Sequence, residues 1–119
     1  MSADHSHNKP IVIRLDEPEW DLVNAHRLGG LLRPAYDCKS VVIDMTGVRF
    51  MDSVAVAQLL VMYRERVLRN GHPPAHLAIS SLAVYRMLEI MGLRALWSTH
   101  ATVAEAVRAA AKNGHTEAS

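Results

Sequence analysis

Three consecutive β-branched residues, Val41, Val42 and Ile43, lie in the middle of the segment SVVIDMTG at residues 40–47. A continuous apolar run, without the alternation of a half-exposed strand, indicates a strand that is buried on both faces. Such strands occur in parallel sheets, whose crossover connections place helices on the sheet. Of all the segments in the chain, this one constrains the fold most, and it predicts an α/β domain.

The other elements alternate between strand and helix, as parallel crossovers require. We predict further strands over residues 11–15, 75–80 and 93–98. We predict helices over residues 20–32 (stopped by Pro34), 53–69, 81–91 and 102–112, the last with a capping box from Thr102 to Glu105. We therefore expect a single domain with a small, mixed or mostly parallel sheet of about four strands and about four helices. It would span residues 10–113, between a flexible leader (1–9) and a frayed tail (114–119).

The composition excludes several classes of function. With 119 residues, a formal net charge of +1 and 5% aromatic residues, the chain shows neither the basic surface nor the stacking residues of a nucleic-acid-binding protein. No apolar run reaches the length that crosses a bilayer, the start is polar, and Cys38 is the single cysteine. We expect a cytoplasmic protein without direct membrane insertion. His5 and His7 in the leader do not indicate a metal site, and we expect neither a metal nor a cofactor.

A polar pair, Asp52 and Ser53, precedes the most apolar helix of the chain. Either residue can act as an N-cap, and with Asp52 as the cap, Met51 and Val56 have the spacing of a hydrophobic staple. A functional interpretation fits the same geometry. A phosphate on a hydroxyl at a helix start is tolerated by the helix dipole, and its charge of about −2 would repel a partner that docks there.

The order of four segments resembles the STAS domain family, which includes anti-sigma factor antagonists and the tails of sulphate transporters. The segment VVIDMTGVRFMDSVAVAQLL resembles the family's core signature of strand, turn, Asp-Ser step and apolar helix. The resemblance continues upstream in EWDLVNAHRLGGLL and downstream in LAISSLAVYRMLEIMGLRALW and STHATVAEAV, so that it covers about residues 11–110.

This resemblance implies partner switching. In the family, an unphosphorylated antagonist binds an anti-sigma factor, typically a serine kinase, and phosphorylation at the start of the apolar helix blocks binding. The family pattern is Asp-Ser, then the phosphorylated Ser or Thr, then Gly. Asp52 and Ser53 match it, but Val54 occupies the acceptor position and Ala55 the Gly position. The usual acceptor is therefore missing.

Three alternatives follow from Val54. Ser53 could be the acceptor instead, the protein could be a permanently active antagonist, or it could be a scaffold-type or transporter-associated STAS protein that binds an ATPase component. We favour a binding module without the standard switch. The residues predicted to bind a partner are Trp20, Asp21, Arg49, Met51, Asp52, Ser53, Val54, Ala55 and Gln58. A polar rim is predicted from Arg49, Tyr63, Arg64 and Arg66.

An enzyme is disfavoured, and no catalytic residue is predicted. A receiver-type site would use Asp44 as phospho-acceptor and Asp16 with Glu17 to hold magnesium, but the lysine expected after a later strand is absent. The alternative for Asp44 is a turn in which its carboxylate bonds the backbone near Thr46. No nucleophile motif GxSxG is present. Three further histidines are interpreted as solvated side chains: His72, His76 and His100.

Overall fold

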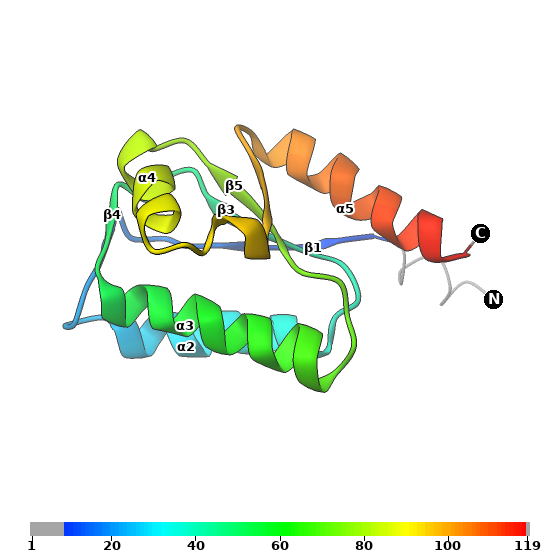
Figure 1. The fold of residues 1–119 in the computed structure, drawn as a ribbon, viewed down its shortest axis with the longest axis horizontal. Helices are drawn as coiled ribbons and strands as arrows, with labels where there is room; N and C mark the ends of the chain where they lie inside the picture. The colour runs from blue at the N-terminus through cyan, green and yellow to red at the C-terminus, as the bar shows by residue number, and fades with distance from the viewer. Residues whose placement is uncertain (1–8, 119) are drawn as a thin grey trace.

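A four-stranded, all-parallel sheet with the strand order β1-β3-β5-β6 forms the centre of the molecule (Figure 1). The computed structural model describes residues 9–118, and the side chains of residues 9–112. The strands of this sheet are β1 (Ile11–Arg14), β3 (Val41–Met45), β5 (His76–Ile79) and β6 (Ser98–His100). The predicted α/β class with a mostly parallel sheet is confirmed.

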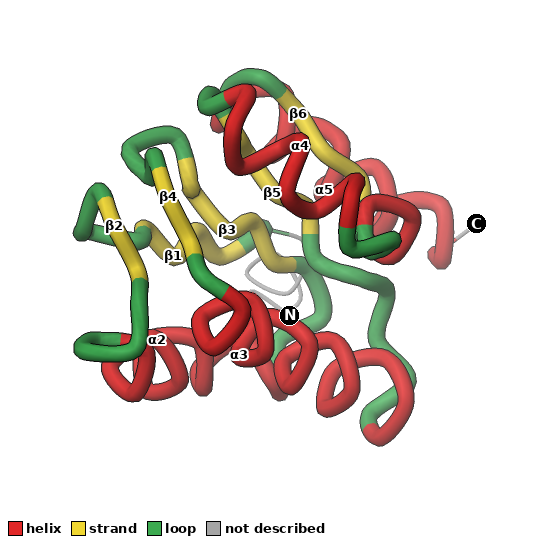
Figure 2. Tube along the Cα trace, turned by 60° about the vertical axis from the view of Figure 1, so that its left-hand side comes forward, coloured by secondary structure: helices red, strands yellow, loops and turns green. Residues whose placement is uncertain are grey.

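Helices cover both faces of this sheet. On one face α2 (Ala25–Leu32) and α3 (Ser53–Tyr63) lie side by side, and α5 (Val103–Ala118) covers the other (Figure 1). A fourth helix, α4 (Leu82–Ile90), packs against β4 and β5, and its buried residues Val84 and Leu88 belong to the same core as the inner faces of α2 and α3. A separate parallel pair, β2 (Glu19–Trp20) and β4 (Phe50–Met51), was not predicted; it lies beside the starts of α2 and α3 (Figure 2).

β3 is buried on both faces, as its composition predicted. Val41 and Ile43 belong to the large core under α2 and α3, whereas Val42 belongs to a smaller core with Ala106 and Ala110 of α5. All five side chains are at most 1% exposed. The alanines on α5 are four residues apart and so share one helix face, which lets α5 approach the sheet closely.

The first helix is shorter at its start than predicted. Trp20 belongs to β2, and α2 begins only at Ala25. At its other end, Pro34 does not stop the chain from coiling, because η1 (Arg33–Asp37) continues as a 3₁₀ helix with the proline in its first turn, where a missing N–H costs little.

The predicted strand over residues 93–98 is wrong for most of its length. Gly92 (φ +73°) ends α4, and the amides of Gly92 and Leu93 donate to the carbonyls of Glu89 and Leu88 at 3.0 and 2.9 Å. This is a Schellman motif. It leads directly into a 3₁₀ turn, η3 (Arg94–Leu96), in which the Leu96 amide donates to the Leu93 carbonyl at 3.0 Å. The backbone is free to pair with β5 only from Ser98.

Arg66, predicted as part of an exposed rim, is instead fully buried, with 0% exposure. It lies in η2 (Arg64–Arg69), a π-helical continuation of α3. Its guanidinium donates to the carbonyls of Ala35 (2.6 Å), Pro73 (2.7 Å), Lys39 (3.3 Å) and Cys38. Burial lowers the pKa of Arg66 to about 10. Four carbonyl acceptors replace the water that the cation loses, so Arg66 joins the end of α3 to the segment before β3.

The ends of the chain were predicted as a leader and a frayed tail. Most of the leader, including His5 and His7, lies outside the described residues. At the other end, the backbone of α5 is helical from Val103 to Ala118, which extends beyond the predicted end near Lys112. Among the described helices, none is long and apolar enough to cross a bilayer.

Replacing Arg66 with alanine is expected to lower the free energy of unfolding by about 3 kcal/mol or more, because several buried carbonyls lose their donor at once. Urea unfolding followed by circular dichroism measures this loss. Arg69→Ala is the control, since the Arg69 side chain is 70% exposed and makes only a surface ion pair with Glu65; its cost should stay below about 0.5 kcal/mol. Equal losses in the two variants would contradict the role given to Arg66.

Candidate functional site

Asp52 is the N-cap of α3, as its position before the apolar helix predicted. Its backbone is extended (φ −92°, ψ 179°) and its Oδ1 accepts the Ala55 amide at 3.0 Å. Met51 and Val56 are both 0% exposed within the same core, consistent with the predicted hydrophobic staple. This cap fixes where α3 begins and leaves the next two residues, Ser53 and Val54, on the surface.

The pairing of β2 with β4 brings the approaches to α2 and α3 together. Trp20 is in register with Met51, and the Asp52 amide donates to the Trp20 carbonyl at 3.0 Å. After β2 and β4, the two segments lead into α2 and α3 (Figure 2). Asp21 follows β2, and Ser53 is the first residue of α3. The structure therefore brings together the two segments predicted to bind a partner, although they are about thirty residues apart in sequence.

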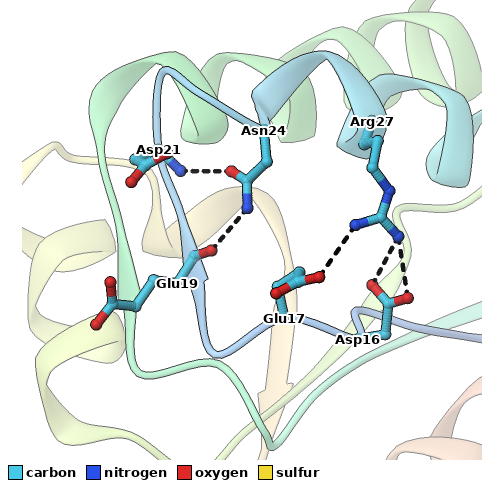
Figure 3. Close-up of polar contacts among 6 residues, drawn as sticks. All are labelled: Asp16, Glu17, Glu19, Asp21, Asn24 and Arg27. Carbon is cyan, nitrogen blue, oxygen red and sulfur yellow. Dashed lines mark hydrogen bonds and ion pairs between the residues drawn. The ribbon is translucent and has the colours of Figure 1, made fainter.

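A set of side-chain hydrogen bonds shapes the loop between β2 and α2 (Figure 3). The Asn24 carboxamide accepts the Asp21 amide at 2.8 Å and donates to the Glu19 carbonyl at 3.0 Å. Asp21 Oδ1 accepts the Val23 amide at 2.9 Å. These bonds satisfy backbone groups in a turn, which is why the helix does not begin at Trp20. They also hold Leu22 and Val23 outward, 73% and 82% exposed.

Arg27 holds the base of the same loop. Its guanidinium makes ion pairs with Asp16 at 3.0 Å and with Glu17 at 3.2 Å (Figure 3). The same guanidinium lies over the Trp20 ring, 5.5 Å from the centroid. All three ion-pair side chains are partly exposed, so each pair adds little stability alone. Together they fix the path of the chain from β1 to β2.

We name the exposed residues at the two helix starts the cap surface. It consists of Asp21, Leu22, Val23, Phe50, Asp52, Ser53 and Val54, all exposed or half-buried. Its apolar members are exposed by 39% (Val54) to 82% (Val23). Glu19 and Arg49 flank it and are also exposed. An apolar centre with a mostly acidic edge is an arrangement found at protein-binding surfaces.

Three of the predicted partner-binding residues do not reach this surface. Trp20, Met51 and Ala55 are each 0% exposed, so they support the cap surface from below. They are buried because β2 and β4 turn these side chains toward the core and Ala55 lies on the inner face of α3. Gln58 is half-buried, and its Oε1 lies over Gly29 of α2.

The sequence reasoning missed Leu22, Val23 and Phe50. Leu22 falls within the helix predicted over residues 20–32, which begins only at Ala25. The signal that could have found it is local: Asp21 and Asn24 are residues that favour turns, and they flank the two apolar residues. Phe50 had no such signal, because a two-residue strand has too few residues to show alternation.

The predicted alternatives for catalysis find little support in the geometry. Asp44 Oδ1 accepts both the Thr46 amide (3.0 Å) and the Thr46 hydroxyl (2.6 Å), the turn predicted as the alternative to a receiver site. Asp16 and Glu17 are paired with Arg27. Within the described part of the chain, no three metal-ligating side chains gather in one place.

Two of the histidines interpreted as solvated are in contact instead. His76 Nδ1 and His100 Nε2 are 3.0 Å apart, and their ring centroids are 5.2 Å apart. His76 is only 5% exposed. Burial lowers the pKa of His76, and the nearby charges of His100 and Arg66 lower it further. The pair joins β5 to the edge strand β6 and lies away from the cap surface.

The contact of Gln58 with Gly29 distinguishes two neighbouring glycines of α2. A Cβ at Gly30 would have no atom within 4 Å. Gly30→Ala should therefore raise the free energy of unfolding by up to about 1 kcal/mol, the difference in helix propensity between the two residues. A Cβ at Gly29 would lie 2.8 Å from Gln58 Oε1, so Gly29→Ala should gain less or lose stability. Urea unfolding of both variants, and of Gly29→Ala with Gln58→Ala, checks this. If the second substitution fails to recover the gain, the contact is not the cause.

The comparisons with known proteins agree with this geometry. A family model of the STAS domain matches residues 3–106. Solved structures with the same fold include a candidate anti-sigma factor antagonist from Thermotoga maritima (18% identity, TM-score 0.68, covering 89% of this chain and 98% of that one). Another is an anti-sigma factor antagonist from Mycobacterium paratuberculosis (24%, 0.70, 83% of each chain).

A third similar structure is a sulfate transporter family protein from Wolinella succinogenes (22% identity, TM-score 0.64, covering 86% of this chain and 84% of that one). No curated protein matches this chain. At these identities the solved structures establish the fold alone, whereas the family match spans most of the sequence. The parallel sheet, the capped apolar helix and the match over residues 3–106 lead to one conclusion: this chain belongs to the STAS domain family.

Proposed function

We propose that this protein is a regulatory binding module, an anti-sigma factor antagonist that works in the cytoplasm and does not act as an enzyme. Its partner would be an anti-sigma factor or a serine kinase of the sigma-regulatory type. The observation that carries the proposal is the cap surface, where four exposed apolar side chains lie in the paired segments that lead into α2 and α3. Exposed apolar side chains gathered at one place favour a protein partner over a small substrate.

The character of the surface also defines the partner. Leu22, Val23, Phe50 and Val54 would enter an apolar depression, and basic residues around that depression would face Asp21 and Asp52. Burying an exposed apolar side chain of this size contributes about 1–2 kcal/mol, so that four suffice for a specific but reversible complex.

The second part of the proposal is that binding is not controlled by the usual phosphate. Val54, at the family's acceptor position, is 39% exposed and has no hydroxyl. Ser53 is exposed beside it and is the alternative acceptor. Because valine has no hydroxyl, phosphorylation cannot add charge at residue 54. The apolar side chain of Val54 therefore stays available for docking.

An alternative partner is the ATPase component of a membrane transporter, to which the protein would bind as a STAS subunit. The similarity to a sulfate transporter family protein supports this alternative. Both alternatives use the same fold, so they are distinguished by measuring which of the two partners this protein binds.

Val54→Glu introduces a charge at the centre of the cap surface and is expected to weaken partner binding at least about tenfold, or about 1.4 kcal/mol. Isothermal titration calorimetry against a sigma-regulatory kinase from the same genome, and separately against a transporter ATPase, measures this. Leu68→Glu is the matched control, because Leu68 is 70% exposed in η2 at the far end of α3. Equal affinities of the two variants for both partners would exclude this surface.

Incubation with the cognate kinase followed by mass spectrometry tests the missing switch. The natural protein is expected to gain no phosphate, whereas Val54→Ser should be phosphorylated, because the hydroxyl then stands at the position the family uses. Combining Val54→Ser with Ser53→Ala assigns the phosphate to residue 54. Phosphate on Ser53 of the natural protein would overturn this part of the proposal without affecting the binding surface.

A further inference from the structure

β1 is an edge strand of the four-stranded sheet. In the described part of the chain, β3 is its only paired neighbour in the sheet. The Ile11 amide donates to the Ser40 carbonyl at 3.1 Å, and the Leu15 amide donates to the Asp44 carbonyl at 3.0 Å. Backbone groups alternate in direction along a strand. The amides and carbonyls of Val12 and Arg14 therefore point away from the sheet, where another strand can bind them.

Among the described residues, the face of β1 that carries Val12 is only partly covered. α5 packs on β3, β5 and β6, so its cover ends before β1. Val12 is 46% exposed, although its neighbour in the sheet, Val42, is 0% exposed on the same face. An added strand at this edge would bury the apolar side chain of Val12 and would bind the outward backbone groups.

The charges around β1 indicate which strand would pair with its outer side. Lys9 precedes β1, and Asp16 and Glu17 follow it. If a second copy of β1 lies antiparallel with Ile13 opposite Ile13, Lys9 of each copy faces Glu17 of the other, a half-exposed carboxylate that also pairs with Arg27 of its own chain at 3.2 Å. In the same register Val12 faces Arg14, and their outward amides and carbonyls form hydrogen-bonded pairs. Pro10, which has no amide, falls at the end of this ladder, where its carbonyl can still accept the amide of Asp16.

The neighbouring registers are less favourable. A shift in one direction places Arg14 directly opposite Arg14, and like charges in that position repel. A shift in the other direction places Arg14 opposite Pro10 and removes Glu17 from Lys9. A shift by a single residue is excluded because it would turn the core-facing side chains outward. The charges thus select one register, and its two-fold symmetry closes the assembly.

We propose that two copies of this chain associate through antiparallel β1 strands centred on Ile13, which joins the two four-stranded sheets into one. The proposal is independent of the function proposed for the cap surface.

Sedimentation velocity over a wide concentration range tests the association. For the natural protein, the mass derived from sedimentation is expected to be twice the monomer mass of 13.2 kDa. Val12→Pro removes an outward amide that β3 does not use, and should shift the equilibrium to monomer by at least about tenfold in dissociation constant. Val12→Thr keeps the amide and is the control that should remain dimeric. A monomeric natural protein at every concentration, or a dimer that Val12→Pro leaves unchanged, would overturn the proposal.

The register has its own test, which does not depend on the proline variant folding. In a Cys38→Ser background, Ile13→Cys should form a disulfide between copies on mild oxidation, because residues facing each other across the two-fold axis are close. Ile11→Cys, on the same face of β1, should not, since its counterpart lies several residues away. Lys9→Glu should weaken the dimer at low salt, and Lys9→Glu with Glu17→Lys should restore it. Cross-linking through Ile11 instead of Ile13 would refute this register.

Discussion

The burial of β3 on both faces is the constraint on which the rest of the structure depends. Val41 and Ile43 require a helical layer on one side of the sheet, and Val42 requires another layer on the opposite side. A strand with helices on both faces is typical of a parallel sheet, since crossover connections place helices on each side. The position of α5 opposite α2 and α3 therefore follows from three side chains, and β1 and β6 remain as the edges.

The candidate site depends on how firmly α3 is held. At its start, the Asp52 cap and the β2–β4 pair fix the first turn. At its far end, Arg66 binds the carbonyls that lead into β3. A helix fixed at both ends presents Ser53 and Val54 in a constant position, which lowers the entropy that a partner must remove on binding. The same Asp52 thus has a structural role and, in the proposed function, a place at the interface.

Two surfaces of the described residues, the cap surface and the outer side of β1, differ in what they offer to a partner. The cap surface offers apolar side chains with an acidic edge, which suits a partner of complementary shape and charge. The outer side of β1 offers backbone donors and acceptors with a charge pattern that complements itself. Backbone pairing is tolerant of sequence, so that in the proposed dimer the specificity comes from Lys9, Glu17 and Arg14.

The sequence by itself determined the features that arise within a few residues. The buried strand, a polar cap at the start of the apolar helix and the order of strands and helices all follow from local chemistry or periodicity. Only the tertiary structure decided that Trp20, Met51 and Arg66 are buried and that Leu22 and Phe50 are exposed. The physical reason is that β2 and β4 are two residues long and carry no periodic signal, and that Arg66 finds its acceptors in segments far away in sequence. Contacts of this kind are specified by the folded backbone and leave no pattern in any short stretch of the chain.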